Sequence, residues 1–361
     1  CSDHRDLHSS PARRASDPPY SAPLARVAPE RFGLAVCTVD GEEHAAGDAS
    51  APFTLQAAAN PLVYALVSGW AGPGAIHARV GMEPSGNPFH AIEFDPRTNR
   101  PFNPLGNAGA IAVCSLVPGA SPERVRKGLG ALAGGGPLAV DEEVLAAERA
   151  AGDRNHAIAC LLRNFGLVDD EEAALDLYLR NCSLVADCRT LARIGATLAA
   201  GGRGVVAPEH VRNTLSLMVT CGLHDGSGTF AREVGIPAKT GISGAILAVV
   251  PGRMGIAVWS PRVDAQGSSV RGVPFYRQIL SLGCFLLMKT VVPFRHVRDY
   301  SAGFRAYDST ILQRMILAYG CDKLVEESGF VCMLEILLKL RAIGATAAEI
   351  PYTLRYDLKA G

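Results

Sequence analysis

The chain has 361 residues and carries 35 acidic and 35 basic side chains, so its formal net charge is zero. A neutral chain lacks the excess of Lys and Arg with which proteins bind nucleic acids or anionic membrane surfaces. Hydrophobic residues make up 48% of the sequence and charged residues 19%. This composition is typical of a globular protein of one or two domains and excludes a largely disordered chain.

Residues 1–19 are rich in Ser, Pro and Arg, and we expect them to be disordered. Residues 31–48 alternate between apolar and polar side chains around Asp40 and Gly41, which predicts a β-hairpin. From about residue 57 to 220 the pattern is mostly helical. Within it, Ser121 and Pro122 are predicted as N-cap and first position of one helix, and Gly166 as the end of another.

Residues 245–261 form two β-rich runs joined by Pro-Gly-Arg-Met, which predicts a second hairpin. Strands therefore open and close this part of the chain, with helices between them. The simplest arrangement is an α/β fold: one antiparallel sheet built from both ends of the segment, with an inserted helical subdomain.

The character of the sequence changes after about residue 275. Three helices are predicted at 275–292, 309–320 and 329–344, followed by a strand at 345–358. No sheet-building partner for this strand is visible nearby. We therefore expect residues 276–361 to be a separate, mainly helical C-terminal appendage.

The sequence gives little support for a metal site, a cofactor or a disulfide framework. The ten cysteines are scattered, and neither a C-x-x-C pair nor an H-E-x-x-H motif occurs. His4 and His8 are four residues apart, but they lie in the polar N-terminal segment and are not expected to bind a metal. Scattered cysteines in a chain of this length fit buried, reduced thiols of a cytoplasmic protein.

A membrane span is not expected either. The most apolar stretch, residues 279–288, is followed by Lys289 and is too short to cross a bilayer. No signal-peptide pattern is present, so the predicted location is the cytoplasm.

Several motifs resemble the bacterial glutaminase family, in the same order, over about residues 20–273. They are EPSGNPF at 83–89, NPLGNAGAI at 103–111, RNHAIACLLRNFG at 154–166, YLRNCSL at 178–184 and the long stretch from CGLHDGSG to AVWSP at 221–261. The resemblance implies the serine β-lactamase/DD-peptidase-like fold and hydrolysis of L-glutamine to L-glutamate and ammonia. It also implies a homo-oligomer, either a dimer or a tetramer.

Hydrolysis of an amide requires a nucleophile, a base, donors for the oxyanion and groups that hold the substrate. In this fold an S-x-x-K motif at a helix N-terminus supplies the nucleophile and the base, because one turn places the Lys amine beside the Ser hydroxyl. A K-[ST]-G strand lines the opposite wall, and here it reads Lys239-Thr240-Gly241.

The resemblance also implies a set of substrate-binding positions: Tyr20, Asn107, Glu148, Asn155, Tyr178 and the backbone of Ile242. Glu148 can pair with an α-ammonium group, and Asn side chains can hold a carboxylate or a carboxamide. Glu148 and Asn155 are seven residues apart, so on one helix both would face one pocket. Structural alternatives remain: Asn107 as a helix cap, Glu148 as a solvated carboxylate and Tyr178 as a core residue.

The chain departs from the family where the chemistry should be. The family has Gln-Ser-x-Ser-Lys, whereas this chain has Gln56-Ala-Ala-Ala-Asn60, so Ala57 stands at the nucleophile position and Asn60 at the base position. No other S-x-x-K occurs in the sequence. His224 stands where the family places a Tyr. Cys221 and His224 are candidate substitute nucleophiles, but the sequence shows no partner for either.

These departures predict a pocket that persists while hydrolysis is strongly impaired. Loss of the Ser nucleophile in another serine hydrolase lowers turnover on the order of a million-fold, or about 8 kcal/mol of barrier. Ala is a strong helix former, so the helix itself should be retained. The alternative is a non-catalytic pseudoenzyme that binds L-glutamine or L-glutamate.

The C-terminal segment carries a second resemblance. Residues 297–307, 329–345 and 348–361 resemble the end of a family 2 glycosyltransferase of the dolichol-phosphate mannosyltransferase type. This implies that Asp299 and Arg305 lie near a phosphate group and that Arg355 contacts one. The nucleotide-binding half of such an enzyme is not visible in the sequence, so a fragment of a polyprenyl-phosphate sugar transferase without activity is predicted.

The sequence therefore predicts a hybrid of two families: a natural fusion, an engineered chimera or an assembly error. We expect the apolar helices of its tail to lack their native partners, which predicts exposed apolar surface and self-association.

Overall fold

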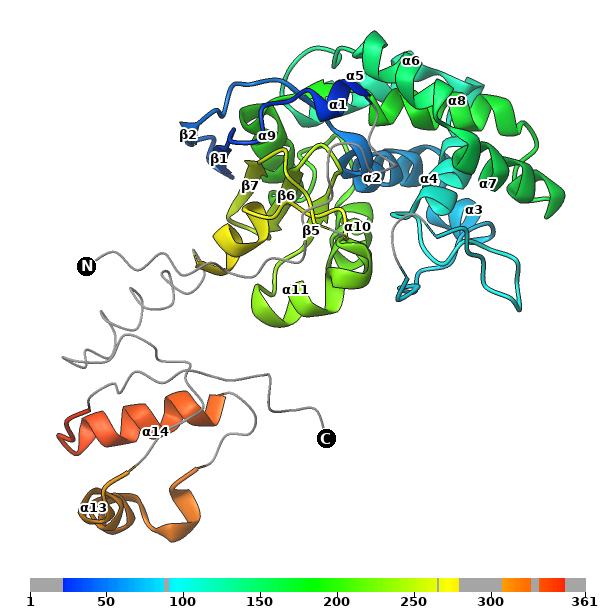
Figure 1. Cartoon of the computed structure of the whole chain (residues 1–361). Coiled ribbons are helices and arrows are strands. Elements are labelled where there is room, and N and C mark those ends of the chain that lie inside the picture. Colours follow the sequence, from blue (N-terminus) through cyan, green and yellow to red (C-terminus); the bar gives the residue numbers. More distant parts are fainter. Residues whose placement is uncertain (1–21, 88–90, 265, 279–306, 326–330, 348–361) are drawn as a thin grey trace, which may run out of the picture. The chain divides into compact units, whose positions relative to one another are not determined.

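The computed structural model describes residues 22–87, 91–264, 266–278, 307–325 and 331–347. The chain divides into two compact units, Cys1–Phe275 and Tyr276–Gly361 (Figure 1). Four residues with predicted roles lie outside the described part, namely Tyr20, Asp299, Arg305 and Arg355. The predicted disordered segment, the apolar stretch at 279–288 and most of the predicted C-terminal strand lie outside it too.

A five-stranded antiparallel sheet in the order β2-β1-β7-β6-β5 forms the first unit's framework. Its strands are β1 Gly33–Thr38, β2 Glu43–Gly47, β5 Ala238–Thr240, β6 Ala245–Val250 and β7 Met254–Trp259. The residues Gly33 and Ala245 both pair with Trp259, so the early hairpin lies beside the late one. Both predicted hairpins are confirmed, and so is the α/β fold with one antiparallel sheet built from the two ends of the segment.

The chain between the two hairpins is largely helical, as predicted. Its helices are α2 Asn60–Ala71, α3 Pro73–His77, α4 Asn107–Cys114, α5 Pro122–Leu132, α6 Glu142–Ala150, α7 Asp153–Asn164, α8 Glu171–Cys182, α9 Cys188–Ala199, α10 Pro208–Cys221 and α11 Ser227–Glu233. A short helix, α1 Ala22–Ala25, precedes the sheet. The Ser121 hydroxyl accepts a hydrogen bond from the Arg124 amide at 3.2 Å, which confirms the predicted N-cap of α5.

Two short features of this region were not predicted. The strands β3 Phe53–Thr54 and β4 Val185–Ala186 form a two-stranded sheet of their own. Residues 78–106 contain no helix or strand among their described positions. Strands of two residues carry no readable alternation, so periodicity cannot reveal them.

Helix α9 packs directly on the sheet, beside β1 and β7 (Figure 1). The contact is close because glycines meet there: a Cβ on Gly255 of β7 would lie 2.3 Å from the Ala192 carbonyl oxygen of α9. A Cβ on Gly195 of α9 would lie 2.8 Å from the Gly255 Cα. Side chains in this position would therefore push the helix off the sheet.

We expect Gly255→Ala to lower the free energy of unfolding by about 1–3 kcal/mol, because the added methyl group meets backbone atoms that cannot move aside. Urea unfolding followed by tryptophan fluorescence measures this, since Trp70 and Trp259 both lie in the first unit. Gly228→Ala in α11 is the control, because no heavy atom lies within 4 Å of its added Cβ. Equal losses in both variants would show that the α9–β7 contact is looser than described.

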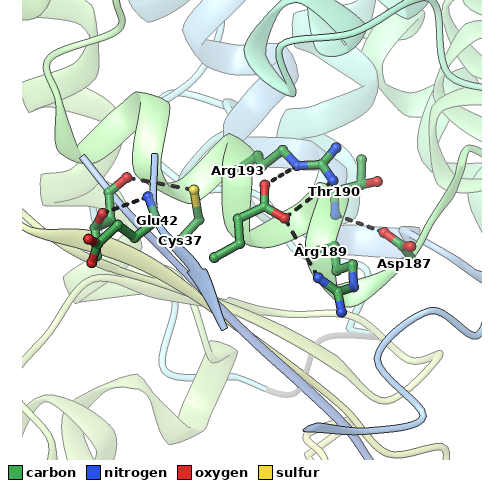
Figure 2. A network of polar contacts seen from close by, with 8 residues as sticks. Cys37, Glu42, Asp187, Arg189, Thr190 and Arg193 are labelled. Atoms are coloured by element: carbon green, nitrogen blue, oxygen red, sulfur yellow. Dashed lines mark hydrogen bonds and ion pairs between the residues drawn. The ribbon is translucent and has the colours of Figure 1, made fainter. Parts of the chain in front are cut away.

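A network of ion pairs joins the edge strand β2 to the start of α9 (Figure 2). The Glu43 carboxylate receives a hydrogen bond from Arg193 and lies 3.8 Å from the Arg189 guanidinium. The Asp187 carboxylate caps α9 by accepting from the Thr190 amide at 2.7 Å. These side chains are partly exposed, so the ion pairs stabilise the fold by no more than about 1 kcal/mol each, and we assign them a structural role.

The second unit contains two of the three predicted helices, α13 Ser309–Tyr319 and α14 Val331–Ala342. Its small core is formed by Met315, Leu337, Leu340 and Ala345. On α13, Leu312, Ile316 and Leu317 are exposed, and Leu317 retains 86% of its accessible surface. None of the described helices of the chain is long and apolar enough to cross a membrane.

Candidate active site

The alanine run forms a short 3-10 turn, Gln56–Ala59, that leads directly into α2. Gln56 adopts a φ of 49°, and its side-chain amide donates to the Thr54 hydroxyl at 3.3 Å. Ala58 and Ala59 are fully buried, whereas Ala57 is half-buried. Ala57 is thus the alanine of this run that keeps accessible surface.

The K-T-G strand β5 lies against this turn, as the resemblance implied. A Cβ on Gly241 would lie 2.6 Å from the Leu55 carbonyl oxygen and 3.4 Å from the Ala58 amide nitrogen. Glycine is therefore needed at 241 for the strand to approach the turn. The two motifs that frame the site in the sequence are in contact in the structure.

Lys239 is fully buried, and its Nζ lies 3.3 Å from the His224 Nε2. The same ammonium nitrogen donates to the Thr240 carbonyl oxygen at 2.8 Å. Burial lowers the pKa of Lys239 from 10.5 to about 7, since a charge is costly away from water. Burial and then the nearby Lys239 hold the pKa of His224 well below 6.5. The sequence showed no partner for His224, and the structure supplies one.

A cavity opens beside this pair. It is lined by residues from 84–87, 91–93 and 101–109, together with Cys221 and His224. The lining thus comes from three of the motifs that carried the resemblance. Burial raises the pKa of the Cys221 thiol above its usual value of 9.0, which keeps it protonated and a poor nucleophile near neutral pH.

Asn107 lines the cavity, and its side-chain amide donates to the Asn155 Oδ1 at 3.1 Å. The alternative that Asn107 caps a helix is wrong, because Gly106 occupies the N-cap of α4 and Asn107 is its first residue. The Asn103 Oδ1 instead accepts from the amides of Leu105 and Gly106, at 3.1 and 3.2 Å. Asn103 was not among the predicted site residues, although it belongs to the NPLGN motif.

Glu148 and Asn155 do not share one helix, so the condition under which their seven-residue spacing would place them on one face is not met. Glu148 belongs to α6 and Asn155 to α7, and the chain breaks at Gly152 between them. Glu148 is half-buried with a buried Oε1, so it is not simply a solvated surface carboxylate. Its charge is one of the causes that raise the pKa of Tyr178, which places the carboxylate and the phenol near each other.

Tyr178 is 4% exposed, so it is a core residue as the structural alternative proposed. Burial is the main cause that raises its pKa well above 10. Tyr178 nevertheless lines a second, narrow pocket together with Asn60, Cys114 and Asn181. The Asn60 amide donates to the Leu105 carbonyl oxygen at 2.9 Å, so the base position is occupied by a group that cannot take up a proton there.

The structure therefore brings the predicted residues together as three pairs: Asn107 with Asn155, Lys239 with His224, and Asn60 with Tyr178. Five of the predicted residues line neither of the two pockets: Ala57, Glu148, Asn155, Lys239 and Ile242. Ile242 follows the K-T-G strand and is half-buried.

Within the described residues, no group of three His, Cys, Asp or Glu side chains is arranged to hold a metal ion. Burial is described for seven cysteines: five are buried, whereas Cys160 and Cys321 are exposed, so the expectation of buried thiols is wrong for these two.

The glutaminase family model matches residues 17–283. The chain belongs to the glutaminase family. It is 46% identical over 263 residues to the glutaminase of Clavibacter michiganensis, and the match covers 69% of this chain and 79% of that protein. It is 41% identical over 283 residues to the glutaminase of a Nostoc species, covering 75% of this chain and 85% of that protein.

Solved structures of glutaminases share the β-lactamase-like fold of this chain. A probable glutaminase of Bacillus subtilis superposes with a TM-score of 0.68 at 29% identity, covering 70% of this chain and 88% of that one. Mglu in its glutamate form superposes with a TM-score of 0.69 at 36% identity, covering 74% of this chain and 64% of that one. The family match ends at residue 283, so the glycosyltransferase resemblance of the tail stays a prediction.

Proposed function

We propose that this glutaminase-family chain binds L-glutamine and L-glutamate and hydrolyses L-glutamine at a strongly reduced rate. The proposal of a reduced rate rests on the turn from Gln56 to Asn60. It lies against the K-T-G strand, where the family places its reacting groups, and offers neither a hydroxyl nor an amine. A family member crystallised in its glutamate form supports the choice of ligand.

The binding half of the proposal rests on the residues that remain. The Glu148 carboxylate suits the α-ammonium group of the ligand, and the amides of Asn107 and Asn155 suit its carboxylate or carboxamide oxygens. Asn107 and Asn155 come from different helices and are hydrogen-bonded to each other, so each orients the other. A preformed pair of this kind binds with little loss of side-chain entropy.

The catalytic half rests on what the chain lacks. Ala57 has no oxygen to form an acyl-enzyme, and the Asn60 amide is already bonded to the Leu105 carbonyl oxygen. Removal of a Ser nucleophile from another serine hydrolase lowers turnover by on the order of 10⁶-fold, while binding groups and oxyanion donors retain roughly 10³-fold over water. Turnover in this chain is expected in that low range.

We expect Asn155→Ala to weaken L-glutamate binding by about 5–30-fold, which corresponds to loss of one or two hydrogen bonds at roughly 1 kcal/mol each. Isothermal titration calorimetry measures the effect. Asn164→Ala is the matched control, because Asn164 is exposed and lies at the C-terminal end of the same helix. If both variants bind L-glutamate like the unchanged chain, Asn155 does not belong to the ligand pocket.

A non-catalytic role is the second candidate, favoured by the packing of the alanine run. Ala58 and Ala59 are completely buried, so the fold accommodates this turn well without its reacting groups. A purely binding protein would titrate with L-glutamate and release no ammonia from L-glutamine above the uncatalysed rate. Hydrolysis at even a low rate, in protein from a host lacking its own glutaminases, would rule this candidate out.

A further inference from the structure

The proposed function gives no role to the contact between His224 and Lys239. The imidazole lines the cavity, and its Nε2 lies 3.3 Å from the Lys239 Nζ, so the pair links the cavity to a fully buried amine. These two residues are fifteen positions apart and come from different elements, the turn His224–Gly226 and strand β5.

The turn that presents His224 is held in place by hydrogen bonds. The Ser227 hydroxyl donates to the His224 carbonyl oxygen at 2.8 Å and accepts from the Leu223 amide at 2.9 Å. His224 itself adopts a φ of 55°, a conformation that costs energy for a residue with a Cβ. The imidazole therefore occupies a defined position at the cavity wall.

The titratable groups around the pair come from several elements. The thiols of Cys182 in α8 and Cys221 in α10 act on Lys239, and Lys239 in turn acts on His224. Glu148 acts in turn on Cys182, and Glu83 acts on Cys221. Burial opposes the protonated form of Lys239 and lowers its pKa to about 7, so a proton acceptor exists near neutral pH.

We propose that His224 and Lys239 form a proton relay that activates water for direct attack on the carboxamide of bound L-glutamine. This inference rests on the proposed function, since it requires the ligand pocket. It assigns the residual hydrolysis to a pair that replaces both the Ser–Lys dyad and the family's Tyr. General base catalysis by a positioned imidazole contributes typically 10²–10⁴-fold, which fits a slow but measurable reaction.

The step conserves atoms and charge. The water oxygen forms a bond to the carboxamide carbon while its proton passes to the His224 Nδ1, and the Nε2 proton moves to the neutral Lys239 amine. The tetrahedral intermediate then collapses: the carbon–nitrogen bond breaks and the leaving nitrogen takes the proton back from the relay. The γ-carboxylic acid that forms then gives its remaining proton to the released ammonia, so the products are L-glutamate and ammonium, and no acyl-enzyme forms.

The relay has a pH signature. Only neutral Lys239 can take up the proton, so kcat for the residual reaction should rise about tenfold per pH unit below pH 7 and level off above it. We expect His224→Gln and Lys239→Met each to lower this rate at least tenfold and to remove the step near pH 7. Gln at 224 can still accept a hydrogen bond from the lysine, but it cannot carry a proton.

The experiment measures ammonia release from saturating L-glutamine between pH 5.5 and 9, using the full chain from a host without glutaminases. His44→Gln is the matched control, because His44 is exposed on the edge strand β2. Titration with L-glutamate is run on every variant. The relay predicts that His224→Gln loses turnover and the pH step while its affinity for L-glutamate changes less than about threefold.

Three results would overturn the relay while leaving the ligand pocket intact. They are turnover in His224→Gln equal to that of the unchanged chain, turnover abolished by Cys221→Ala, and no ammonia release above the uncatalysed rate from a chain that binds L-glutamate. The second would indicate thiol attack. The third would also overturn the hydrolytic half of the proposed function, whereas failure of the unchanged chain to bind L-glutamate would overturn its binding half.

Discussion

Restoring Ser at position 57 and Lys at position 60 is expected to raise the turnover of L-glutamine by roughly 10³-fold or more. Ala57 keeps accessible surface in a turn that contacts the K-T-G strand, so a Ser hydroxyl at this residue would lie where the family has its nucleophile. Asn60 lies in the pocket with Tyr178, where burial would lower the pKa of a Lys amine and make it a base.

The two changes should act together and not singly. A nucleophile without its base, or a base without its nucleophile, contributes little, because such residues work as a unit. Ala57→Ser and Asn60→Lys alone are therefore expected to give less than a tenth of the gain of the double variant. Ammonia release from saturating L-glutamine measures all three.

The matched control moves the hydroxyl by one residue: Ala58→Ser combined with Asn60→Lys. Ala58 is fully buried, so its hydroxyl would not reach the ligand, and no gain is expected. If the Ala57→Ser, Asn60→Lys chain binds L-glutamate and yet shows no increase in turnover, positions 57 and 60 are not the nucleophile and base positions of this site.

Replacing Lys239 by Met is expected to change how stability depends on pH. Lys239 has a pKa of about 7 in the folded chain and an ordinary value of 10.5, so between these values the unfolded chain binds a proton that the folded chain does not. Stability contributed by this residue therefore rises with pH across that window and is lowest below pH 7, where a buried charge must be carried.

Between pH 7 and 10.5 this titration changes the free energy of unfolding by about 5 kcal/mol, of which about 3 kcal/mol falls between pH 7 and 9.5. The Lys239→Met variant lacks this titrating group. Its free energy of unfolding should therefore exceed that of the unchanged chain most below pH 7, and the difference should shrink by about 3 kcal/mol by pH 9.5. Urea unfolding at pH 6, 8 and 9.5, followed by tryptophan fluorescence, measures the difference.

Lys127→Met serves as control, because the Lys127 side chain is 67% exposed on α5. Its effect should be the same at all three pH values. A pH-independent difference for Lys239→Met as well would mean that Lys239 keeps its proton in the folded chain. The relay with His224 would then lack its acceptor.

The two hairpins and the start of α5 were predictable because their signals are local. Alternation around Asp40 and Gly41 gave the first hairpin, and Ser121 followed by Pro122 gave the start of α5. Each depends on residues a few positions apart, whose preferred conformations agree with the final fold.

The arrangement of the site was less predictable because its contacts join distant segments. A spacing of seven residues would put Glu148 and Asn155 on one face of a single helix, but Gly152 separates α6 from α7. The hydrogen bond from Asn107 to Asn155 and the approach of Lys239 to His224 depend on how helices and strands pack. Motif resemblance named these residues without revealing which of them meet.

The most direct measurement determines the L-glutamine turnover of the unchanged chain together with its affinity for L-glutamate, in one preparation. If the pocket is retained and its nucleophile is missing, we expect saturable L-glutamate binding. We also expect turnover at least about 10³-fold below that of the Ala57→Ser, Asn60→Lys chain. Equal turnover in the two chains, or no L-glutamate binding by either, would contradict it.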